Sequence, residues 1–175
     1  MRHERIPLGG GASEGFMDTY LLDRSPELPR KKGRPAMVIC PGGGYCFTSD
    51  REAEPVAVRF ASLGFQSFVV RYSVAPARFP TALFELSRAV AEVRNHAGEW
   101  DVDPERIIVC GFSAGGQMCI RDSVNSLHLD FYYIFAFQKK STHDDTHPQA
   151  SYGQKDTRNS HIISCNTPLH CLKHQ

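Results

Sequence analysis

The chain has 175 residues, 41% of them hydrophobic, and a formal net charge of +1. This length supports one domain with a hydrophobic core and gives no reason to expect two. The small net charge gives no electrostatic argument for nucleic-acid or membrane-surface binding, and no apolar run approaches the ~20 residues that span a bilayer. Residues 1–15 are charged and then glycine-rich, unlike a secretory signal, so we expect a cytoplasmic protein.

Short apolar runs and turns alternate in the first part of the chain. Residues 15–23 alternate loosely between apolar and polar side chains, which suits an early strand. Residues 26–35 hold three prolines with basic residues between them and indicate a solvated turn. Residues 36–40 are continuously apolar, which predicts a strand buried on both faces of a parallel sheet. This strand ends at a glycine-rich segment, residues 41–45, called the glycine loop below.

The following segments alternate between helical and strand patterns. Apolar residues spaced by three and four predict helices over residues 51–63 and 81–97. Residues 65–72 and 106–110 are rich in β-branched or other apolar residues and predict strands, with a turn at residues 101–104 before the second. Strands that alternate with helices favour an α/β fold, a doubly wound, mostly parallel sheet with helices on both faces.

Cysteines are expected to be buried thiols rather than disulfides. Cys40 and Cys110 lie inside apolar strand-like runs, and none of the six cysteines has the close spacing of a zinc site. We therefore expect no metal.

Residues 111–115 read Gly-Phe-Ser-Ala-Gly and match the nucleophile elbow, a sharp strand-to-helix turn with a serine at its apex. A strained backbone at the apex pushes the side chain of Ser113 outward, and Gly111 and Gly115 leave room for the neighbouring elements. The alternative is that Ser113 only caps a helix, which is the commoner role of such a serine. The preceding apolar strand and the upstream glycine loop favour the nucleophile.

Three glycines in the glycine loop let the main chain pass close to a bound acyl group. Amides held in this way stabilise the oxyanion of ester hydrolysis by several kcal/mol. We predict that Gly43, Gly44 and Ala114 donate to it. The alternative is that the glycines form a flexible linker, but flexible linkers seldom lie between two strands of one core. Neither loop has the glycine pattern of a dinucleotide or P-loop site.

Five segments resemble bacterial α/β-hydrolase esterases of the acetyl-xylan and acetyl esterase-like group. They read CPGGGY (residues 40–45), REAEPVAVRFASLGF (51–65), VVRYSVAP (69–76), FP (79–80) and DPERIIVCGFSAGG (103–116). The resemblance spans about residues 21–117. It implies the N-terminal half of an α/β-hydrolase fold, hydrolysis of short acyl esters such as acetylated sugars, and no cofactor. Many relatives have a histidine where this chain has Pro41.

The composition changes near residue 118, in the middle of an expected element. All nine glutamates lie at or before Glu105, whereas six of the eight histidines follow Met118. Residues 118–123 read MCIRDS and look like a translated sequencing adapter. We therefore expect residues 1–118 to be the N-terminal part of the hydrolase domain. Residues 119–175 are expected to be an atypical tail, either read-through or disordered, although 127–137 could form a strand or helix.

A serine nucleophile needs a histidine base and an orienting carboxylate, which follow the serine in this family. Only residues 114–175 follow Ser113, and they offer weak candidates. These are Asp144, Asp145 and Asp156 for the acid and His161, His170 and His174 for the base. A metal pair at His143 and His147 is less favoured than a solvated loop. We assign no catalytic role to any of them.

The sequence thus predicts a serine carboxylic ester hydrolase that is incomplete as given and itself inactive. Its expected partner is a small-molecule ester, with neither nucleic acid nor membrane. Tyr45, Asp50 and Arg78 are candidates for the rim of the substrate pocket, and the sequence does not rank them. Two alternatives remain open: a serine peptidase of the prolyl-oligopeptidase type, and a non-catalytic fragment or binding protein.

Overall fold

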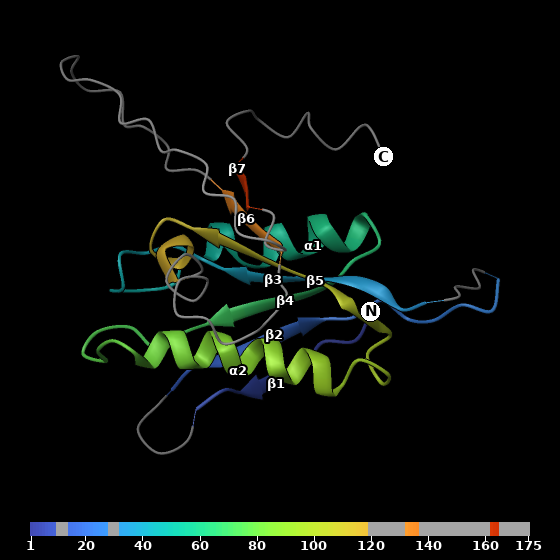
Figure 1. The fold of residues 1–175 in the computed structure, drawn as a ribbon, viewed down its shortest axis with the longest axis horizontal. Helices are drawn as coiled ribbons and strands as arrows, with labels where there is room; N and C mark the ends of the chain where they lie inside the picture. The colour runs from blue at the N-terminus through green and yellow to red at the C-terminus, as the bar shows by residue number, and fades with distance from the viewer. Residues whose placement is uncertain (10–13, 28–31, 119–131, 137–161, 165–175) are drawn as a thin grey trace, which may run out of the picture.

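A single mixed β-sheet organises the described part of the chain. The computed structural model describes residues 1–9, 14–27, 32–118, 132–136 and 162–164 (Figure 1). Within these residues the strand order is β1-β2-β4-β3-β5-β6-β7. The strands are β1 (Arg5–Pro7), β2 (Phe16–Tyr20), β3 (Arg34–Cys40), β4 (Gln66–Arg71), β5 (Val102–Phe112), β6 (Tyr132–Ala136) and β7 (Ile162–Ser164).

In the sheet, the neighbouring strands β4, β3, β5, β6 and β7 are all parallel to one another. This confirms the expected mostly parallel α/β sheet. The exceptions lie at the opposite edge, where β2 pairs antiparallel with both β1 and β4. The sequence did not predict β1, because this strand has three residues and a mixed pattern of exposure.

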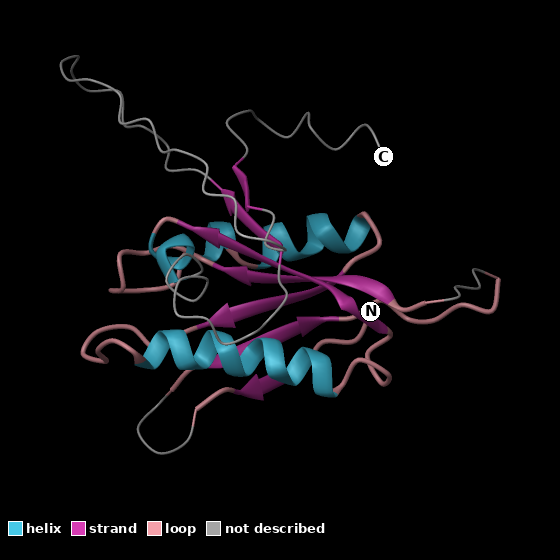
Figure 2. Cartoon of the chain, viewed as in Figure 1, coloured by secondary structure: helices cyan, strands magenta, loops and turns pink. Residues whose placement is uncertain are grey.

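Two helices cover opposite faces of the sheet (Figures 1 and 2). A short 3₁₀ turn, η1 (Asp50–Glu52), leads into α1 (Glu54–Ser62), and α2 (Thr81–Asn95) connects β4 to β5. Both match the predicted helices. The buried stripe of α2 includes Leu86, Ala89, Val90 and Val93, at the spacing of three and four that brings residues to one helix face.

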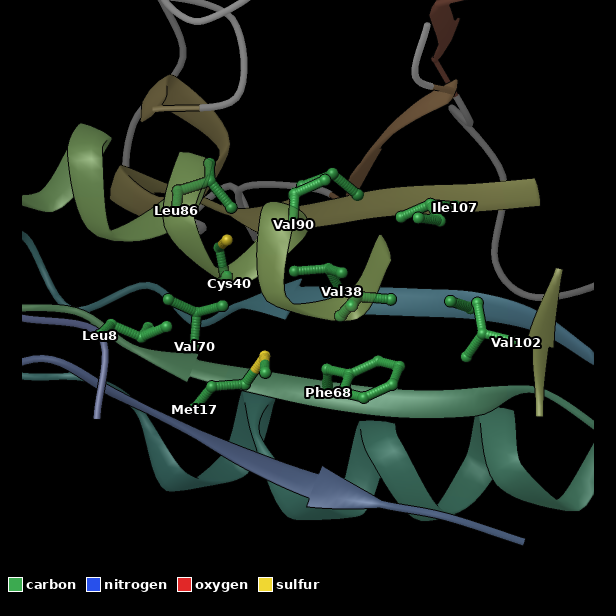
Figure 3. Close-up of a cluster of buried hydrophobic side chains, with 14 of the residues drawn as sticks. Leu8, Met17, Val38, Cys40, Phe68, Val70, Leu86, Val90, Val102 and Ile107 are labelled. Carbon is green, nitrogen blue, oxygen red and sulfur yellow. The ribbon is translucent and has the colours of Figure 1, made fainter. Parts of the chain in front are cut away.

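Strand residues alternate between the two cores. Val38 and Cys40 of β3 join the cluster under α2, and Ile39 joins the cluster under α1. Figure 3 shows Val38 and Cys40 together with Phe68 and Val70 of β4, facing α2. Burial of a large apolar side chain contributes about 1.5–3 kcal/mol. This burial on both faces of the sheet explains the continuously apolar strand sequences. Cys40 and Cys110 lie in these strands and are buried free thiols, as predicted.

The turn predicted at residues 101–104 is only partly correct. Asp101 has a left-handed φ of 55°, but β5 already begins at Val102 and continues through Pro104. The Asp103 carboxylate accepts hydrogen bonds from the Glu105 amide at 3.1 Å and from Arg106 Nε at 2.7 Å. These bonds satisfy polar groups locally, so polar residues can stand within an extended segment.

Two short strands lie in the region beyond residue 118. The backbone of β6 pairs in parallel with β5, and β7 pairs with β6. β6 falls within residues 127–137, where the sequence allows a strand or a helix. The proposed tail boundary stays a prediction. Among the described residues, no helix combines the length and the apolar character needed to cross a membrane.

Candidate active site

Ser113 stands at the sharp turn where β5 ends and a helix begins. Its φ is +49°, a region that non-glycine residues adopt rarely, and its side chain is exposed. Residues 114–118 are helical, and the Gln117 amide donates to the Ser113 carbonyl at 3.1 Å. A backbone held in such a region stores about 1–3 kcal/mol, and residues of this kind cluster at functional sites.

The glycines on either side of Ser113 are required by close backbone packing. A Cβ at Gly111 would lie 2.6 Å from the Cα of Gly116. A Cβ at Gly115 would collide with the carbonyl oxygens of Cys40 and Pro41. The second contact joins the elbow to the start of the glycine loop, so the two segments are packed against each other.

The glycine loop reaches Ser113 because β3 and β5 are neighbours in the sheet, with Cys40 opposite Gly111. Their carboxyl ends therefore meet at the same edge, the usual position of ligand sites in open α/β sheets. A Cβ at Gly42 would lie 3.1 Å from the Cβ of Ser113. Gly43 and Gly44 follow with φ values of 139° and 61°.

The predicted oxyanion donors gather at this point. Gly43 and Gly44 lie in the loop next to Gly42, and Ala114 follows Ser113. Within the described part of the chain, no hydrogen bond engages the amides of these three residues. These three amides are therefore not used in the hydrogen bonding of the described part of the fold.

A cavity of about 260 Å³ adjoins the elbow. Its wall includes Tyr45, Arg78, Phe79 and Gln117. The Tyr45 hydroxyl donates to the Ala114 carbonyl at 3.1 Å, which ties this wall to the elbow. Two of the three rim candidates, Tyr45 and Arg78, therefore line the cavity.

Asp50, the third rim candidate, forms an ion pair with Arg71 at 2.8 Å and does not line the cavity. The sequence could not separate it from the other two, because all three stand in polar segments near the glycine loop or after β4.

The two histidines among the described residues pack against aromatic rings. His3 packs edge-on against Tyr20, and His96 stacks on Trp100 at 4.5 Å beyond the end of α2. The acid and base candidates from Asp144 to His174, and the His143/His147 pair, lie outside the described residues. Among the described residues, no group of three or more His, Cys, Asp or Glu could hold a metal ion.

Glu52 is a site residue that sequence reasoning missed. Its Oε2 accepts a hydrogen bond from the Gly42 amide at 2.8 Å. An acidic residue just before an amphipathic helix is typical of a solvated helix start, so the sequence carried no signal for this contact.

Comparisons with known proteins agree with this geometry. A family model described as alpha/beta hydrolase fold matches residues 37–126. The chain is 30% identical over 115 residues to esterase LipQ of Mycobacterium tuberculosis, covering 65% of this chain and 27% of LipQ.

Two solved structures are also similar. One is MGS-M1, an alpha/beta hydrolase enzyme from a Medee basin deep-sea metagenome library, with a TM-score of 0.70, 30% identity, and coverage of 86% of this chain and 64% of that one. The other is an acetyl ester-xyloside bifunctional hydrolase from Caldicellulosiruptor lactoaceticus, with a TM-score of 0.63, 28% identity, and coverage of 77% and 56%.

The chain thus spans about a quarter of LipQ and less than two thirds of each of these structures. The family model covers just over half of the chain and includes both the glycine loop and the elbow. The chain belongs to the α/β-hydrolase fold family.

Proposed function

We propose that the protein is a serine ester hydrolase for short acyl esters, with Ser113 as its nucleophile. One observation carries the proposal: a serine at a left-handed φ, exposed at a strand-to-helix turn, is packed directly against a glycine loop. This combination of a presented hydroxyl and nearby free amides is what acyl transfer needs.

In this proposal Ser113 Oγ attacks the acyl carbon, and a base removes its proton. A bond forms between Oγ and carbon, and the carbonyl π electrons move to the oxygen. Gly43, Gly44 and Ala114 donate to that oxyanion, and the helix N-terminus after Ser113 adds a favourable field. Collapse expels the alcohol, which takes a proton from the base, and water then releases the acid by the same steps. The base and its carboxylate partner lie outside the described residues.

Acetylated carbohydrates are the proposed substrate class. A cavity of about 260 Å³ is at the small end for ligand sites, which favours a small ligand or group. Exposed Phe79 offers an aromatic surface for a sugar ring, while exposed Gln117 offers a hydrogen-bonding amide group. The likeness to an acetyl ester-xyloside hydrolase supports the same class.

The test uses the protein translated from the complete gene, whatever its length. We expect it to hydrolyse p-nitrophenyl acetate faster than the octanoate, and to release acetate from acetylated xylo-oligosaccharides. S113A should lower kcat/KM by at least about a thousandfold, because the nucleophile is lost. S87A is the matched control, since Ser87 lies on α2 and, among the described residues, its hydroxyl donates to the Leu83 carbonyl within the same helix.

Activity that survives in S113A would rule out Ser113 as the nucleophile. Turnover of a prolyl peptide instead of the acetyl esters would favour the peptidase alternative. No turnover of either substrate would favour the non-catalytic alternative.

A further inference from the structure

The glycine loop is held at Gly42 by the side chain of Glu52 and the backbone of Ser49. The Gly42 amide donates to Glu52 Oε2 at 2.8 Å, and the Gly42 carbonyl accepts from the Ser49 amide at 2.8 Å. Both partners belong to one short stretch, because Glu52 ends η1 and its own amide donates to the Ser49 carbonyl at 3.2 Å. Gly42 is therefore fixed on both sides by the turn that follows the loop.

Gly42 has little room to move away from this position. A Cβ there would lie 2.9 Å from the Phe112 carbonyl oxygen, 3.0 Å from Glu52 Oε2 and 3.1 Å from Ser113 Cβ. The residue is thus enclosed between the carboxylate and the elbow. The Glu52 carboxylate therefore approaches Gly42 where this residue also lies close to Ser113.

The hydrogen bond also determines which amides remain available. The Gly42 amide is used by Glu52, whereas no hydrogen bond among the described residues engages the amides of Gly43 and Gly44. Hydrogen bonds to a carboxylate are roughly twice as strong as neutral ones. Without the acceptor, the buried Gly42 amide would have no hydrogen-bond partner, which costs free energy. A rotation of the loop that exposes this amide to water would lower that cost.

We propose that Glu52 is a positioning residue that fixes Gly42 and thereby aims the amides of Gly43 and Gly44 at the oxyanion. This inference rests on the proposed function but concerns a different atom pair. Two variants separate the effect of the hydrogen bond from the effect of the negative charge. E52Q and E52A both remove the charge, and only E52Q keeps an acceptor for the Gly42 amide.

The experiment introduces S113C, because a thiol at this position reports the local donors without needing a base. Thiolates are stabilised by nearby N–H donors and helix N-termini and react with iodoacetamide in the deprotonated form. Alkylation is followed across pH by peptide-resolved mass spectrometry in S113C alone and combined with E52Q, E52A or E54A. Glu54 is the control, an exposed glutamate two residues away in the first turn of α1.

We expect alkylation at pH 7 to be slower in E52A than in E52Q by about threefold or more, corresponding to a raised thiol pKa. E54A should match the parent. In ¹⁵N-glycine-labelled protein, the Gly42 amide should exchange with deuterium faster in E52A, whereas E52Q should keep most of the protection. Circular dichroism establishes that each variant is folded.

Equal alkylation rates in E52A and E52Q would overturn the inference, as would an unchanged Gly42 exchange rate in E52A. Neither readout depends on ester turnover. An inactive enzyme with the expected alkylation and exchange therefore contradicts only the proposed function.

Discussion

Gly115 is the residue at which the elbow packs against the start of the glycine loop. Its α-carbon faces the carbonyl oxygens of Cys40 and Pro41, which are backbone groups and cannot rotate away as a side chain could. The glycine therefore determines how closely the elbow approaches the glycine loop.

We predict that G115A lowers the free energy of unfolding by about 1–3 kcal/mol, the usual cost of forcing an extra carbon into packed structure. G98A is the matched control, because a Cβ at Gly98 meets nothing within 4 Å. Urea unfolding of both variants measures the difference. Equal stabilities would show that the elbow and the loop are not packed as described.

The start of β5 illustrates how a polar pair supports an element. The Asp103 carboxylate bonds to Arg106 Nε, which lies three residues later, and Arg106 also donates to the Gly33 carbonyl at 2.7 Å. The hydrogen bond from Arg106 lowers the pKa of Asp103 below its ordinary value of 3.8. Sequence patterns identified the helices and the central strands through their periodicity, but they placed a turn at residues 101–104. The bonds of Asp103 there are local, but Arg106 also bonds to Gly33, which is far away in sequence, and a local pattern does not reveal that contact.

A lowered pKa in the folded state means that the ionised form stabilises folding. This contribution is fully present above pH 3.8 and is lost as the pH falls through the lower folded-state value. We predict that D103N is less stable than the parent at pH 7 and that the difference shrinks in acid. E99Q, at an exposed glutamate, serves as the control in thermal unfolding from pH 7 to pH 2.5. A difference between D103N and the parent that stays constant down to pH 2.5 would contradict the assigned cause.

At the scale of the whole molecule, the sheet is wider than the sequence indicated. The α/β class, both helices and the meeting of the glycine loop with Ser113 could be predicted, because each depends on local pattern and on strands that pair in parallel. The position of β4 between β2 and β3, and the antiparallel edge, could not be predicted, because they depend on pairing between distant segments. Glu52 was missed for the same reason, since its role depends on how η1 folds back onto Gly42.

The pairing of β6 with β5 gives a test of the region after residue 118. A chain that ends at Met118 would leave β5 as an open edge, and open edges promote association between chains. We predict that this truncated chain aggregates more than the 175-residue chain, as measured by light scattering at equal concentration. Equal solubility would instead support the expectation that residues 119–175 are a tail outside the domain.

The central claim is that the elbow and the glycine loop form a site that stabilises negative charge at position 113. The pH dependence of iodoacetamide alkylation in S113C tests this claim most directly, because it needs no residue outside the described part of the chain. S62C is the control, since Ser62 lies at the opposite, C-terminal end of a helix, where the helix dipole disfavours a thiolate. We predict that the thiol introduced at position 113 has a pKa below about 8.5, the ordinary value, and below that of the control. A pKa at or above the control would contradict the assignment of Ser113 and its neighbouring amides as the reaction centre.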